Sequence, residues 1–74
     1  MDIPAAVPER LHSLAKRLSW EDCVNLLTLY EGWSQTHRTA EIRARSGKLA
    51  DDMRLLVNAL PYEWEVPPVK EHGP

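Results

Sequence analysis

The sequence predicts an all-α protein: a small helical hairpin or three-helix unit with an extended C-terminal tail. Apolar residues recur at helical spacing over most of the chain, which is typical of amphipathic helices. Alternation of the kind expected for a strand is confined to 62–66. With 74 residues the chain has room for one domain, close to the lower limit for folding on a hydrophobic core alone.

The N-terminal part divides into an irregular lead over 1–7 and a first helix over about 8–18. Pro8 stands at a position where proline is tolerated, in the first turn of a helix. Charged residues occupy the opposite side of this segment, which makes it amphipathic. The helical spacing is carried by Leu11, Leu14, Ala15 and Leu18.

A second helix is predicted over 20–31. Ser19 is a good N-cap, and Asp22 three residues later completes a capping box. Gly32 is expected to end this helix in the left-handed conformation, and Trp33 to fold back over the last turn.

A third helix is predicted over 39–60, with Thr39 as its N-cap. Its apolar residues fall within an arc of about 100°, the width of one core-facing stripe. The pattern continues across Gly47, which favours one helix; in the alternative, the second helix runs on to about Arg45 and breaks at 46–47. The stripe consists of Ile42, Leu49, Met53, Leu56, Val57 and Leu60.

The remaining segment, 61–74, is predicted to be an extended, proline-rich aromatic tail. Pro61 ends the third helix, and 62–66 alternates apolar and acidic residues as a strand does. Two prolines at 67–68 favour polyproline geometry in the last part of the chain. The tail could pack back across the hairpin or extend to a neighbouring chain.

The second helix carries more apolar surface than one packing face requires. Its apolar side chains span roughly 220°, about twice the stripe of an ordinary surface helix. Either this helix is central, between the other two helices and the tail, or part of it binds a partner. The candidate partner-binding residues are Leu26, Leu29, Tyr30, Trp33 and, from the tail, Trp64.

Basic residues on and before the third helix favour an alternative function, a helix-turn-helix-like nucleic-acid-binding protein. However, Glu41 precedes Arg45 by four residues and Lys48 precedes Asp52 by four, which predicts mutual neutralisation. The net charge of −2 also argues against a phosphate-binding surface. Three arginines without a local partner are candidate rim or phosphate contacts: Arg38, Arg43 and Arg54.

No catalytic, cofactor or metal site is predicted. The three histidines, His12, His37 and His72, are scattered, whereas zinc needs three or four converging ligands. Cys23 is expected to be a small core residue, although its place in the first turn of a helix would lower its pKa. Without a second cysteine, no internal disulfide can form.

The cytoplasm is the expected location, because there is no signal peptide and no apolar run of the ~20 residues that span a membrane. The sequence therefore predicts a small non-enzymatic protein-interaction module: an adaptor, regulator or inhibitor that uses the apolar surface of its second helix. The expected partner is a second copy of the chain, a larger protein, or both. A small structural subunit of a larger assembly is a further alternative.

Overall fold

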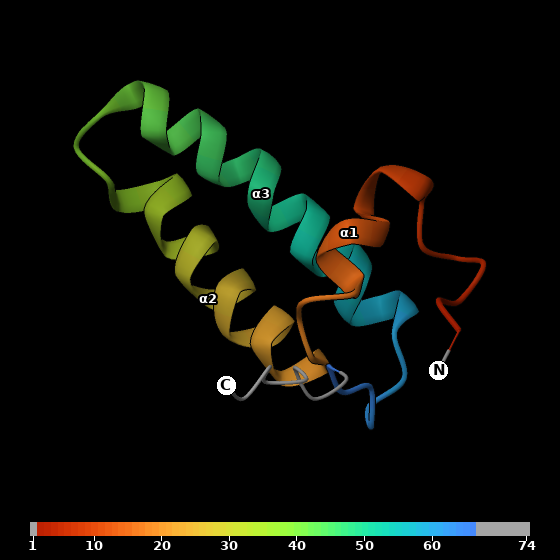
Figure 1. Cartoon of the computed structure of the whole chain (residues 1–74). Coiled ribbons are helices and arrows are strands. Elements are labelled where there is room, and N and C mark those ends of the chain that lie inside the picture. Colours follow the sequence, from red (N-terminus) through yellow and green to blue (C-terminus); the bar gives the residue numbers. More distant parts are fainter. Residues whose placement is uncertain (1, 67–74) are drawn as a thin grey trace, which may run out of the picture.

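The computed structural model describes residues 2–66, which form a helical hairpin with an N-terminal segment folded against one end (Figure 1). A 3-10 turn, η1 (Glu9–Leu11), leads into a short helix, α1 (His12–Ala15). The hairpin consists of α2 (Trp20–Thr36) and α3 (Ala40–Ala59). Within 2–66 there is no strand, and the all-α prediction is confirmed.

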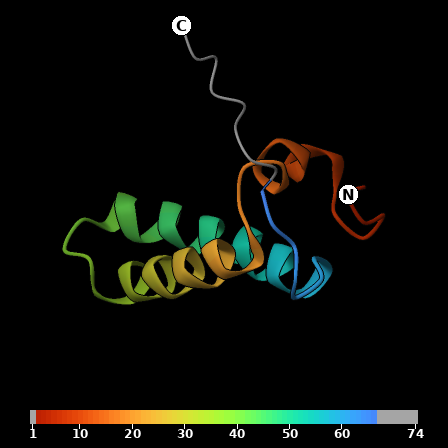
Figure 2. The same cartoon turned by 60° about the horizontal axis from the view of Figure 1, so that its bottom comes forward.

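The two long helices run antiparallel and side by side (Figure 2). Small residues line their contact: Ser46 and Ala50 of α3 are buried. A Cβ atom added at Gly47 would lie 3.9 Å from the Cβ of Ser34 on α2. We call the half of the hairpin nearest the connection, 37–39, the tip. The small side chains let the backbones of α2 and α3 approach closely there.

The predicted start of α2 is confirmed in atomic detail. The amide of Asp22 donates to the Ser19 hydroxyl at 3.0 Å, and the amide of Ser19 donates to the Asp22 carboxylate at 3.1 Å. This capping box satisfies backbone donors that a helix start otherwise leaves unpaired.

The predicted end of α2 at Glu31 is wrong, because the helix continues to Thr36. Gly32 lies inside the helix with ordinary negative φ, and Trp33 occupies a normal helical position. A glycine inside a helix costs only about 1 kcal/mol relative to alanine. Packing of the following turn on α3 outweighs that cost, so the glycine does not end the helix.

The N-terminal segment is less helical than predicted. The continuous helix expected over 8–18 is wrong: η1 and α1 together span residues 9–15, and a turn follows at 16–17. So short a helix is not stable by itself. It is held by Leu11 and Ala15, which are buried against the hairpin.

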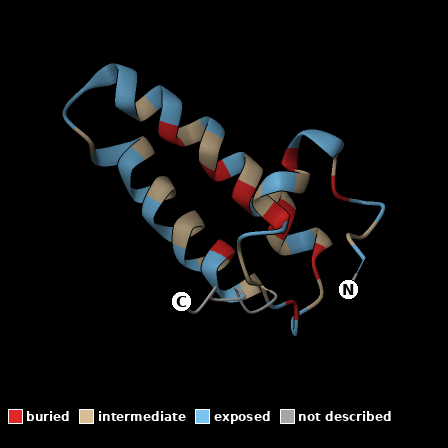
Figure 3. Cartoon of the chain, viewed as in Figure 1, coloured by how far each residue is buried: buried red, intermediate tan, exposed pale blue. Residues whose placement is uncertain are grey.

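The hydrophobic core lies at the end of the hairpin opposite the tip, which we call the base. There the N-terminal segment and the tail meet the start of α2 and the end of α3, and the buried residues gather at this end (Figure 3). The core comprises Val7, Leu11, Ala15, Cys23, Met53, Leu56, Leu60 and Trp64.

The tail residues that the structure describes, 61–66, pack back against the base. The strand-like prediction is wrong, since 62–63 form a turn that carries Trp64 into the core. The indole N–H of Trp64 donates to the Ala15 carbonyl at 2.9 Å, and its own carbonyl accepts from the Trp20 amide at 3.1 Å. The polyproline prediction at 67–68 falls outside the described residues.

We expect Trp64→Ala to destabilise the fold by about 3–5 kcal/mol, because it empties a core position and leaves a buried carbonyl unpaired. Chemical denaturation followed by circular dichroism measures the change. Trp64→Phe keeps most of the volume and gives a smaller loss if the full truncation does not fold. Tyr62→Ala is the control: Tyr62 is 78% exposed, and a loss there equal to that at Trp64 would contradict the core role of Trp64.

Candidate functional site

Three predicted partner-binding residues form one stripe along α2. Leu26, Leu29 and Trp33 follow one another at intervals of three and four residues, which places them on one face of the helix. Leu29 and Trp33 are each 43% exposed, and Leu26 is half-buried against the core. We call these three residues the α2 flank.

The flank is uncovered because α2 is an outer helix. Its packing is chiefly on α3, and Figure 1 shows α3, α1 and the N-terminal segment all to one side of α2. The interpretation of α2 as a central, sandwiched helix is wrong beyond its first turn. There Trp20 packs against Tyr62, with ring centres 5.1 Å apart.

Trp33 is held in place by two neighbouring rings. Tyr30 meets it edge-on with ring centres 6.3 Å apart, and His37 does so at 5.9 Å. Tyr30 itself is half-buried and packs against the core. Tyr30 therefore supports the exposed indole of Trp33 rather than standing free on the surface.

Trp64, the fifth predicted partner-binding residue, lies elsewhere. It is only 4% exposed, and its indole N–H is bonded within the base. The structure thus separates it from the flank, and its role is in the core.

The three arginines predicted to lack local partners differ in their surroundings. The Arg54 guanidinium contacts Asp51 at 3.0 Å and Glu31 of α2 at 3.2 Å, so that prediction is wrong for Arg54. Arg43 donates to the backbone carbonyl of His37 and steadies the connection between the helices. Arg38 is exposed, and no ion pair to it occurs within residues 2–66.

One of the two predicted neutralising pairs forms. Arg45 contacts Glu41 at 3.5 Å. The predicted pair of Lys48 with Asp52 is replaced, because Asp52 accepts from Arg10 at 2.8 Å. That contact joins η1 to α3 across a long sequence separation, which no spacing rule within one helix could reveal.

Charge is distributed unevenly between the two ends of the hairpin. Four of the five charged residues between 34 and 48, at the tip, are lysine or arginine. At the base, where α2 begins and the tail returns, four acidic residues occur together with the basic Lys16 and Arg17 of the turn before α2. The acidic residues there are Glu21, Asp22, Glu63 and Glu65.

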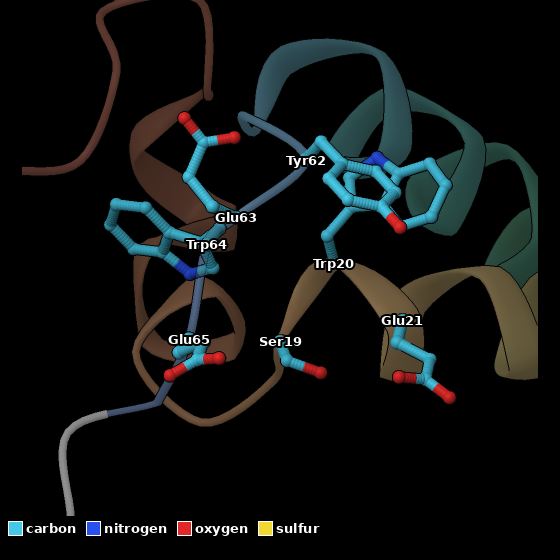
Figure 4. Close-up of a pocket in the computed structure, with 7 residues that line it drawn as sticks. All are labelled: Ser19, Trp20, Glu21, Tyr62, Glu63, Trp64 and Glu65. Atoms are coloured by element: carbon cyan, nitrogen blue, oxygen red, sulfur yellow. The ribbon is translucent and has the colours of Figure 1, made fainter.

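A concave pocket lies at the base, and sequence reasoning missed it. Its volume is about 500 Å³, and the rings of Trp20 and Tyr62 form one side of it (Figure 4). Aromatic faces and carboxylates together favour a cationic group such as a guanidinium. The sequence pattern does not reveal this pocket, because its lining residues come from two segments more than forty residues apart. The remaining lining residues are Ser19, Glu21, Glu63, Trp64 and Glu65.

Cys23 is fully buried, as predicted for a core residue. Burial raises the pKa of its thiol, and the neighbouring Asp22 carboxylate raises it further. The expected lowering of this pKa by the helix dipole is therefore wrong, because desolvation penalises the charged thiolate more strongly. A raised pKa suits packing, whereas nucleophilic chemistry needs the thiolate.

Comparison with known proteins found no matching family model, no matching curated protein and no matching solved structure. Among residues 2–66 there is no group of three or more histidine, cysteine or acidic side chains placed to hold a metal ion. No helix in the same range is long and apolar enough to cross a membrane.

We expect the Cys23 thiol to react slowly with a thiol reagent in the folded protein and rapidly in denaturant, since reaction needs an exposed thiolate. Stability should also fall as the pH rises above about 8.5, because the thiol ionises first in the unfolded chain. For a thiol reagent that releases a chromophore on reaction, absorbance measures the rate of the first effect. Denaturation at several pH values measures the second. Rapid reaction of the native thiol would contradict its burial.

Proposed function

We propose that the protein is a non-enzymatic interaction module, an adaptor, regulator or inhibitor, that binds other protein through the α2 flank. The observation that carries the proposal is the exposure of Leu29 and Trp33, each 43%, on a helix that packs chiefly on one neighbour. An exposed aromatic beside aliphatic side chains is the composition typical of interface hot spots.

The mode of binding follows from the surroundings of the flank. Trp33 would be the main anchor, because an indole buries a large area with few rotatable bonds, and Tyr30 and His37 already restrict it. Leu26 and Leu29 would add the apolar contacts beside it. Arg38 and Arg43 at the tip would supply rim charges, which act on the association rate more than on affinity.

The partners of such a module are a second copy of this chain or a larger protein. A small fold gains most from such a partner, because a chain of this length buries a modest core. The proposal also places the interaction module in the cytoplasm and gives it no cofactor.

Nucleic-acid binding through α3 is the weaker candidate. Arg45 and Arg54 are already engaged by carboxylates, which leaves little free positive charge for phosphates. A mobility shift at low salt that Arg43→Ala weakens would favour that function. A small structural subunit of a larger assembly would instead co-purify with the particles of that assembly.

We expect Leu29→Glu and Trp33→Ala each to abolish capture of the protein's companion in affinity purification from its own cells, because both remove apolar contact from the flank. Helicity should stay unchanged, since both side chains are substantially exposed. Asn58→Glu, at an exposed position of α3 near the base, is the matched control and should retain the companion. Equal capture by all four proteins would overturn the proposal.

A further inference from the structure

We propose that the pocket at the base binds the guanidinium of an arginine side chain from another protein. The pocket lies at the opposite end of α2 from Trp33, and its ligand does not depend on the function proposed for the α2 flank. Three features of the described residues support this ligand: a pair of aromatic rings in a fixed setting, carboxylates without an ion-pair partner, and a volume that suits a small ligand.

The rings of Trp20 and Tyr62 are held in place before any ligand binds. The indole N–H of Trp20 donates to the Val57 carbonyl of α3 at 3.1 Å, and the backbone amide of Trp20 donates to the Trp64 carbonyl at 3.1 Å. Tyr62 packs on this fixed indole with ring centres 5.1 Å apart and planes inclined by 53°. Tyr62 is nevertheless 78% exposed, so it offers an aromatic face to which a cation is attracted.

The charged side chains that line the pocket are all negative. They are Glu21, Glu63 and Glu65, and no lysine or arginine of residues 2–66 lines it with them. None of the three glutamates forms an ion pair with that part of the chain. Lys16 and Arg17 precede α2 at the same end, but the Arg17 side chain donates to a carbonyl of α1 at 3.3 Å. The carboxylates of the pocket are therefore available to a cation from outside.

An arginine fits these features better than a lysine, an anion or a metal ion does. A guanidinium is planar, so it stacks on an aromatic face while it donates to carboxylates at its edge, whereas the lysine ammonium is a strongly hydrated point charge. An anion would meet three carboxylates, and the capping box already uses donors at the start of α2. No three histidine, cysteine or acidic side chains in the described range are placed to hold a metal ion.

The size of the pocket suits a whole side chain. Its volume of about 500 Å³ falls within the range of about 300–1,000 Å³ that is typical of sites for small ligands. Figure 4 shows the paired rings on one side of the pocket and the tail residues 63–65 on the other. The apolar stem of an arginine would lie along the rings, and its charged end would meet the carboxylates.

Titration of the full chain with the blocked tripeptide acetyl-Gly-Arg-Gly-amide tests the proposal, followed by the NMR signals of the three indole N–H groups. We expect the Trp20 signal to shift with millimolar affinity and the Trp33 signal to stay in place. The citrulline analogue has the same shape without the charge and should cause no shift, and the lysine analogue should bind more weakly.

Three results would overturn this ligand. One is the absence of a Trp20 shift with the arginine peptide at up to about 10 mM, where even weak binding is visible. Another is binding of the citrulline or lysine peptide as tight as that of the arginine peptide. The third is a shift of the Trp33 signal alone, which would place the arginine on the α2 flank.

Substitutions test the rings and the carboxylates separately. We expect Tyr62→Ala to weaken binding of the arginine peptide about fivefold, because an aromatic face is lost, and Tyr62→Phe to retain it. The double variant Glu63→Gln/Glu65→Gln should also weaken binding and make it less sensitive to salt. Glu41→Gln, at an exposed glutamate of the tip, is the matched control and should bind as the wild type does. Wild-type binding by Tyr62→Ala would contradict the role of the pocket.

Discussion

The position of Trp64 determines how the rest of the molecule is arranged. Its indole bonds to α1 and its carbonyl to the first residue of α2, so one residue ties the tail to two other segments. The hairpin is thereby closed at its base, and the hydrophobic core gathers around that closure. The N-terminal segment and the tail both pack on the hairpin at its base, so neither of them covers the tip.

The proposed function uses the α2 flank, which the N-terminal segment and the tail leave uncovered. A hairpin of two helices has two faces, and α1 is too short to cover one of them along its whole length. Leu29 and Trp33 therefore stay on the surface, whereas Leu26, which is nearer the base, is half-buried against the core. An exposed apolar stripe costs solvation free energy, and that cost is recovered only when another surface covers it.

Charge and shape act together on α2. The capping box requires an acidic residue at the start of the helix, and the tail adds two glutamates at the same end. The tip is mainly basic, whereas the base carries both acidic residues and the basic Lys16 and Arg17 of the turn before α2. The helix that presents the apolar stripe thus runs from a base of mixed charge to a mainly basic tip, and such a difference in charge influences which surfaces approach it.

The sequence by itself determined the helical class, the capping box at Ser19, the span of α3 and the surplus of apolar surface on α2, because these depend on spacing within one segment. The tertiary structure alone decided that α2 continues past Gly32, that Trp64 is core rather than surface, and that Arg10 replaces Lys48 as the partner of Asp52. Each of these depends on contacts between segments far apart in the chain. Local propensities are worth about 1 kcal/mol or less, whereas burial of a large side chain is worth more, and so the long-range contacts prevail.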